Sequence, residues 1–125
     1  MRAISLSFLL AATALLVACG QKTAPTVSFN QQVKPLLTQY CLECHQPGGK
    51  GYEKSGLSML SYDSLMKGTR IGPVITPGSA QSSTLYRVIA GKADPSIQMP
   101  HNREALAAAD VQLIKDWIDQ GAKNN

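Results

Sequence analysis

Two cysteines and a histidine lie next to one another in the first half of the chain. They form Cys41-Leu42-Glu43-Cys44-His45, a C-x-x-C-H pattern. Two thiols three residues apart on one helical turn can each add to one vinyl group of the same porphyrin, and the histidine that follows then points at the iron. The pattern therefore predicts one covalently attached haem c, with thioethers at Cys41 and Cys44 and with His45 as an axial ligand of the iron.

Paired cysteines have two other common uses, and both fit this chain less well. A thioredoxin-like dithiol is typical of a βαβ context, and no strand is predicted before Cys41. A structural zinc site normally needs four ligands. Outside the motif the chain offers only His101 and Cys19, and Cys19 has another expected role. Haem is therefore favoured over dithiol chemistry and over a metal site.

Four methionines are available for the second axial position of the iron. Met1 belongs to the N-terminal signal, and Met59 and Met66 lie in apolar surroundings that are typical of a packing role. Met99 precedes Pro100, which restricts it to an extended backbone. From such a loop its sulfur could reach the haem face opposite the histidine without the movement of a helix. Met99 is therefore predicted to be the second axial ligand.

His101 is the only other histidine, and it is the alternative second ligand. A bis-histidine site lowers the reduction potential, whereas the soft thioether of methionine favours ferrous iron and raises it. An open or water-bound iron is the third alternative. If His101 is not a ligand, it is expected at the surface or in contact with a haem propionate.

The third cysteine lies at the end of an apolar N-terminal segment. Residues 4–18 are almost entirely apolar but too few to cross a bilayer comfortably, since roughly 20 are needed, so residues 1–18 are predicted to be a secretory signal peptide. Leu16-Val17-Ala18-Cys19 resembles the bacterial lipobox, in which the cysteine becomes the lipidated first residue. An uncleaved signal anchor is the alternative. Lipid on Cys19 would hold the protein to a membrane, and Gly20 favours the outer membrane.

The rest of the chain is expected to hold one domain. Residues 19–27 are polar and lack periodicity, so they are predicted to be the lipidated N-terminus and a flexible tether, followed by a single domain over residues 28–125. Without residues 1–18 the chain keeps 11 basic and 8 acidic side chains, a formal charge of +3. This small excess is scattered, with no arginine-rich run, so nucleic-acid binding is not expected.

An amphipathic helix is expected directly before the cysteine motif. Apolar residues recur at helical spacing at Phe29, Val33, Leu36, Leu37 and Tyr40. Ser28 is the expected N-cap. Pro35 lies inside this pattern, where an interior proline costs about 3 kcal/mol. The helix is therefore expected either to kink at Pro35 or to begin at Lys34 with the proline in its first turn.

The remaining elements are expected to be short helices separated by loops. Residues 46–100 are rich in glycine and proline, and two short helices are expected there, around 61–67 and 82–90. A last amphipathic helix is expected over 107–120, with Gly121 after it as a C-terminal cap. No segment alternates with period two. The prediction is an all-α domain whose long loops need something to wrap around.

In their order along the chain, these features resemble class I c-type cytochromes, specifically the short bacterial cytochrome-c-like modules also found beside planctomycete enzymes. The matching segments are Phe29, Val33-Lys34-Pro35-Leu36-Leu37, the C-x-x-C-H motif, Gly56-Leu57-Ser58-Met59-Leu60, Thr76-Pro77-Gly78, Ser83-Thr84-Leu85, Met99-Pro100 and Trp117-Ile118-Asp119-Gln120-Gly121-Ala122. The resemblance implies a cytochrome c-like fold around one haem, with His45 as the proximal ligand and Met99 as the distal ligand. The chain departs from the pattern at His101, where relatives often have a second proline, and at Ala107, where the last helix is usually capped by Ser or Asp.

The motif and the resemblance together lead to a functional expectation. The chain is predicted to carry single electrons between redox partner proteins on the periplasmic side of a bacterial membrane, and not to be an enzyme. A haem enzyme or gas sensor with an open sixth position is the main alternative. An accessory electron-transfer subunit of a dehydrogenase is another.

Overall fold

The computed structural model describes residues 24–125, so the predicted signal peptide and Cys19 lie outside the described residues. The elements are η1 (Phe29–Val33, π-helical), α1 (Lys34–Tyr40), α2 (Lys50–Ser55), α3 (Tyr62–Lys67), α4 (Thr84–Ile89), η2 (Pro95–Ile97, 3-10) and α5 (Ala108–Asp119). These residues contain no strand, only an isolated bridge between Thr69 and Gly72. The predicted all-α fold is confirmed for this part of the chain. None of its helices is long and apolar enough to cross a membrane.

Pro35 lies in the first turn of α1, as one of the two expectations had it. The preceding turn, η1, is π-helical, and its Val33 N–H bonds to the carbonyl of Ser28 at 3.2 Å. The Ser28 hydroxyl accepts the Gln31 N–H at 3.3 Å, which confirms the predicted N-cap. A separate turn before Lys34 therefore lets the helical path continue although Pro35 has no N–H to donate.

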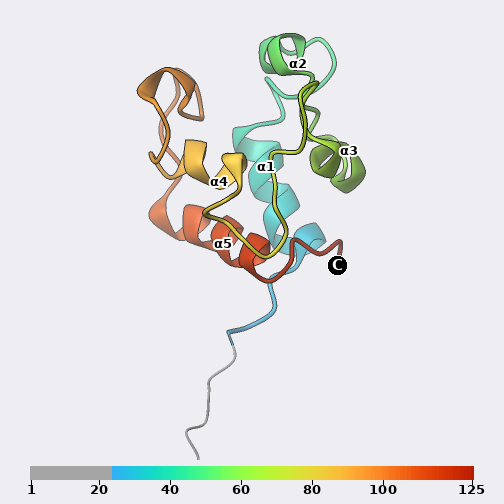
Figure 1. Cartoon of the computed structure of the whole chain (residues 1–125), viewed down its shortest axis with the longest axis vertical. Helices are drawn as coiled ribbons and strands as arrows, with labels where there is room; N and C mark the ends of the chain where they lie inside the picture. Colours follow the sequence, from blue (N-terminus) through green and yellow to red (C-terminus); the bar gives the residue numbers. More distant parts are fainter. Residues whose placement is uncertain (1–23) are drawn as a thin grey trace, which may run out of the picture.

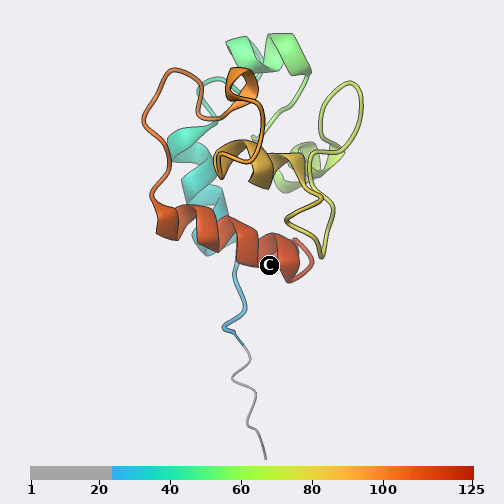
Figure 2. The same ribbon diagram turned by 60° about the vertical axis from the view of Figure 1, so that its left-hand side comes forward.

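The first and last helical segments cross and form the core. Figures 1 and 2 show α5 lying across the lower end of η1 and α1, with α4 above α5. The ring of Phe29 lies 5.4 Å from that of Trp117 and 5.2 Å, edge-on, from that of Tyr62. Val33 and Ile118 are fully buried beside them. Burial of these apolar side chains is the main stabilising term for so small a domain.

The two predicted helices of the middle region are confirmed as α3 and α4, and a third helix, α2, was missed. Gly51 within it and the Pro47-Gly48-Gly49 run before it favour turns. Three contacts nevertheless support the helix. The Tyr52 N–H bonds to the Cys44 carbonyl at 2.8 Å, and Arg70 Nη1 donates to two carbonyls of its last turn at 3.1 Å. Tertiary contacts thus outweigh the weak local propensity.

The two ends of the domain are hydrogen-bonded to each other. The side chain of Gln120 accepts the Val27 N–H at 2.8 Å and donates to the Pro25 carbonyl at 3.0 Å. Asn125 accepts the Phe29 N–H through its side chain at 2.9 Å. These bonds join residues 25–29 to the residue after α5 and to the C-terminal residue, so the chain enters the domain beside the C-terminal end of α5.

Replacing Asp119 with alanine is expected to destabilise the domain in a pH-dependent way. Asp119 accepts the N–H of the fully buried Ala80 and the ammonium of Lys115, both at 2.7 Å, and these bonds lower the pKa of its carboxyl. Loss of the partner of the Ala80 N–H should cost about 1–2 kcal/mol at pH 7. Because the folded-state pKa is lowered, this difference should shrink as the pH falls below the ordinary value near 4. Denaturant unfolding of the holoprotein between pH 3 and pH 7 measures it.

Asp116 provides the matched control, since within residues 24–125 its carboxylate accepts a hydrogen bond only from the side chain of Gln112 on the same helix. Asp116→Ala should change the free energy of unfolding by less than about 0.5 kcal/mol. Equal losses in the two variants would show that the bond to Ala80 adds nothing.

Candidate functional site

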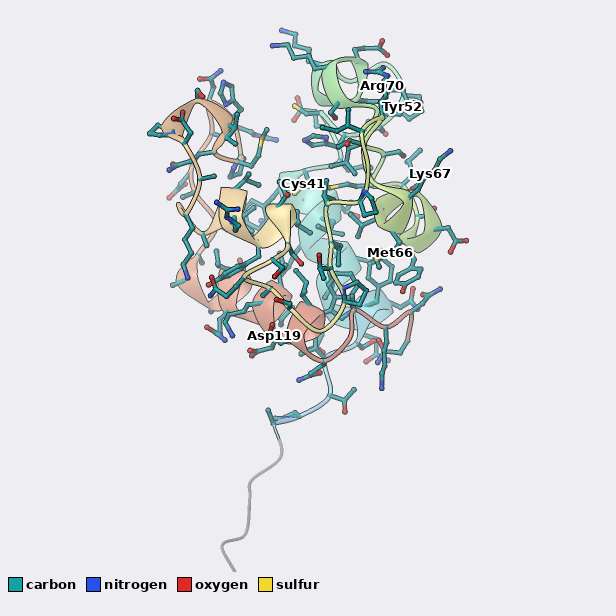
Figure 3. The ribbon with its side chains drawn as sticks, viewed as in Figure 1. Cys41, Tyr52, Met66, Lys67, Arg70 and Asp119 are labelled. Atoms are coloured by element: carbon teal, nitrogen blue, oxygen red, sulfur yellow. The ribbon has the colours of Figure 1, made fainter. Side chains whose placement is uncertain are left out.

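The cysteine motif continues from the end of α1 as a series of turns. The Cys41 N–H bonds to the Leu37 carbonyl at 3.0 Å, and the N–H groups of Cys44 and His45 bond back to the Cys41 carbonyl at 3.1 and 3.0 Å. Both thiols are free and half-buried. Figure 3 shows Cys41 at the upper end of α1, between the segment of residues 91–106 and helices α2 and α3. The structure thus brings both predicted thioether positions to one turn.

The His45 side chain is buried against α2. A Cβ built on Gly51 would lie 2.8 Å from Cε1 of the His45 ring, so only glycine leaves room for the imidazole at this contact. The His45 carbonyl accepts the Met59 N–H at 2.8 Å, which fixes the backbone on its other side. His45 is 8% exposed, and its Nδ1 is buried without a hydrogen-bond partner among the described residues.

Burial sets the protonation state of His45. It lowers the pKa of the imidazole, although the backbone of Leu57 acts in the opposite direction. A lowered pKa favours the neutral ring, which is the form that binds a metal ion. An imidazole held against α2 and kept neutral fits the role of an axial iron ligand.

The environment of Cys41 does not suit dithiol chemistry. Burial raises the pKa of the Cys41 thiol to about 11, despite the nearby positive charge of Arg103. Reactive cysteines of dithiol enzymes have lowered pKa values, because the thiolate is the nucleophile. Nor do residues 24–125 contain a cluster of three or more histidine, cysteine or carboxylate side chains that could hold a metal ion. The two alternative uses of the motif thus find no support in this part of the chain.

The loop that carries Met99 lies beside the motif. Arg103 Nη1 and Glu43 Oε2, the latter from the motif itself, form an ion pair at 3.0 Å. The Met99 N–H bonds to the Val88 carbonyl at the end of α4 at 3.0 Å. A surface pocket between the end of α1 and this loop is lined by Gln39, Tyr40, Pro100, Arg103 and Glu104. In Figure 1 this orange segment and helix α2 stand on either side of the upper end of α1.

The candidate second ligands differ in their surroundings. Met99 is half-buried and packs against the core, whereas His101 is exposed, with its Nδ1 3.4 Å from the Gln98 carbonyl. Met59 is 7% exposed and lies in the core, which confirms its predicted packing role. Met66 is half-buried and packs against the core, as Met99 does. These surroundings favour Met99 over His101.

Two parts of the site were not predicted from the sequence: helix α2 as the wall behind the imidazole, and the Arg103–Glu43 ion pair. The lysine and glutamate of α2, good helix formers between two glycines, were the available signal for the helix. The ion pair joins residues 60 positions apart and leaves no mark on local sequence pattern. Both show how the motif and the loop are held in place.

The residues present fit a haem c. Cys41 and Cys44 would hold it through thioethers, and His45 would bind its iron from the side of α2. When bound, the haem supplies an iron that can take up and release one electron. The chain's part is to hold the ligands, to keep the imidazole neutral and to cover the site with the loops on either side.

Comparison with known proteins bears on the same segment. Residues 41–102 match the family model described as Planctomycete cytochrome C. No curated protein and no solved structure matches the chain. The matched segment begins at Cys41 and extends past Met99, so it contains both sides of the site. The match supports a cytochrome c-like module in this protein and, with the C-x-x-C-H motif, a function in haem-based electron transfer.

Proposed function

We propose that this protein is a single-electron carrier with one covalent haem c. Cys41 and Cys44 form the thioethers, His45 is the proximal axial ligand and Met99 is the distal one. The observation that carries the proposal is His45, which is buried directly after Cys41 and Cys44 with its ring held against Gly51 of α2. Burial lowers the pKa of this imidazole and so favours the neutral ring that binds a metal ion.

The residues of this chain then serve to hold the iron and to limit its chemistry. With a protein ligand on each face, no position on the iron is open to a substrate, so the protein turns over no substrate. The methionine thioether favours the ferrous state and raises the reduction potential. The backbone hydrogen bonds of His45 to Met59 and of Met99 to Val88 would hold both ligands when the iron changes oxidation state. The structural change that accompanies electron transfer would then be small.

The absorption spectrum of the purified holoprotein tests this function, recorded oxidised and reduced, with and without carbon monoxide. A c-type spectrum with the weak sulfur-to-iron band at the red edge and no response to carbon monoxide is expected. Ready binding of carbon monoxide without that band would favour the enzyme or sensor. Purification in a stable stoichiometric complex with a dehydrogenase would favour the accessory subunit. A protein without haem would contradict the proposal.

The place of the protein in the cell is part of the proposal. The signal peptide and the lipobox-like cysteine support a lipoprotein on the periplasmic side of a bacterial membrane, with the outer membrane favoured. Covalent haem attachment agrees with export, because the cytoplasm is reducing. The redox partners would then be periplasmic or membrane proteins.

Cys19→Ala is expected to release the holoprotein from the membrane or to stall its processing, because the lipid can no longer be attached. Haem attachment should be unchanged, since Cys19 is not part of the motif. Fractionation of cells, followed by haem staining of each fraction, measures both. A fully processed variant that stays with the membrane would rule out the anchor.

A further inference from the structure

The excess positive charge of the domain is concentrated on one part of its surface. Residues 50–72 carry four basic side chains and two acidic ones, whereas the rest of residues 24–125 carries six of each. The four basic residues are Lys50, Lys54, Lys67 and Arg70. All four are exposed, and none forms an ion pair within the described part of the chain. The rest of the described domain is therefore neutral overall.

A fully exposed apolar side chain lies at the same place. Ile71 is 99% exposed, far more than the other large exposed apolar residues, Leu60 and Ile97, at 49% and 50%. An isolated exposed isoleucine needs no explanation in itself. This one, however, follows directly after Arg70 at the tip of a turn, where its whole side chain is presented to solvent.

The turn that presents Ile71 is held rigidly. The Thr69 N–H and hydroxyl both donate to the Gly72 carbonyl, at 2.8 and 3.0 Å, and the Gly72 N–H returns a bond to the Thr69 carbonyl at 3.2 Å. The Arg70 N–H bonds to the Ser55 carbonyl at 2.9 Å, which joins the turn to α2. A side chain presented on a preorganised turn loses little conformational entropy when it is covered by a partner.

This surface lies close to the proximal side of the site. At one end of helix α2, Gly51 lies against the His45 ring. At the other end, backbone carbonyls of the helix accept hydrogen bonds from the Arg70 guanidinium. Figure 3 shows Arg70 beside α2 and Lys67 at the end of α3, on the same side of the molecule. A partner bound there would stand one short helix away from the proximal ligand.

The position in the fold favours a protein partner over a lipid surface. Figures 1 and 2 both show residues 24–27 leaving the domain at the end opposite α2. A chain attached to a membrane through its N-terminus would therefore be held by the end of the domain opposite α2. The basic residues near α2 are then accessible to a protein that approaches from the aqueous side.

We propose that Lys54, Lys67, Arg70 and Ile71, here named the basic loop surface, form the docking site for an acidic redox protein. Carboxylates of the partner face the cations, and an apolar recess covers Ile71. The proposal rests on the proposed electron-carrier function and names the surface through which electrons pass. Charge of this kind mainly speeds encounter, whereas the apolar contact sets how long the complex lasts.

Oxidised plastocyanin, an acidic blue-copper protein, is the probe for the test. Oxidation of the reduced holoprotein is followed by stopped flow at low and high ionic strength, and binding to the same probe is titrated by NMR. Lys54→Glu/Lys67→Glu is compared with Lys34→Glu/Lys123→Glu, which changes the net charge equally at exposed positions outside this surface. Arg70 is left unchanged because it also holds the end of α2. Ile71→Ser tests the apolar contact.

The first pair of substitutions should lower the bimolecular rate constant at low ionic strength by about tenfold, and the control pair by less than about threefold. Ile71→Ser should weaken binding several-fold at high salt as well, where charges are screened. Equal effects of the two pairs on rate and binding would overturn the proposal. The proposal would also be overturned if the Lys54→Glu/Lys67→Glu variant lost binding to phosphatidylglycerol vesicles but bound plastocyanin as the parent does. The surface would then serve to bind a membrane. Because binding is measured separately, the surface is tested even if voltammetry shows that the protein does not cycle electrons.

Discussion

Replacing Met99 with alanine is expected to convert a holoprotein that ignores carbon monoxide into one that binds it nearly stoichiometrically. The methyl side chain cannot reach the iron, so the sixth position would be open or held by water. The sulfur-to-iron band should disappear, and the reduction potential should fall, because the thioether that stabilises ferrous iron is gone. Absorption spectra with and without carbon monoxide, together with voltammetry, measure all three changes.

His101→Ala is the matched control for this substitution, because it removes the other candidate ligand from the same loop. The exposed position of His101 predicts an unchanged spectrum and potential. If His101→Ala opened the iron and Met99→Ala did not, the protein would be a bis-histidine cytochrome. If neither variant changed the spectrum of a protein that already binds carbon monoxide, the iron would be open in the native state. Unfolding followed by circular dichroism checks that both variants are folded.

The parts of the fold that were predictable from the sequence are those written in local pattern. The apolar stripe before the motif, the capping Ser28 and the helical spacing before Gly121 each describe a single segment, and the structure confirms them. The C-x-x-C-H motif is local in the same sense, since its chemistry lies within five residues. Met99 is an intermediate case, because its loop was recognisable from the sequence while its role as the second iron ligand stays a prediction.

The parts that were missed depend on contacts between distant segments. Helix α2 forms although glycine interrupts it, because the Cys44 carbonyl accepts a hydrogen bond from its first turn and the Arg70 guanidinium donates to carbonyls of its last turn. The ion pair between Glu43 and Arg103 and the burial of the His45 ring are likewise set by the fold as a whole. Local helix propensities differ by a few tenths of a kcal/mol per residue. The free energy of a hydrogen bond between distant segments, about 1 kcal/mol, is larger than these differences.

Gly51→Ala is expected to destabilise the holoprotein, although alanine is the better helix former. In an exposed helix the change would gain about 1 kcal/mol. At this position the new Cβ would lie 2.8 Å from His45 Cε1 and 3.0 Å from the Cys44 carbonyl oxygen, so the imidazole or the motif backbone must move. Overpacking of this kind typically costs about 1–3 kcal/mol. The clash therefore outweighs the gain, and Gly51→Val should cost more still.

The spectrum separates this effect from a general loss of stability. A displaced His45 ring weakens the proximal ligand, so Gly51→Ala should bind carbon monoxide measurably while remaining folded at room temperature. Lys50→Ala, at the exposed neighbouring position of the same helix, should change neither the spectrum nor the free energy of unfolding by more than about 0.5 kcal/mol. If Gly51→Ala were instead more stable than the parent, with an unchanged spectrum, the imidazole of the holoprotein would not lie against α2. Other residues would then surround the proximal side of the iron. Helix α2 would no longer connect the basic loop surface to the proximal ligand.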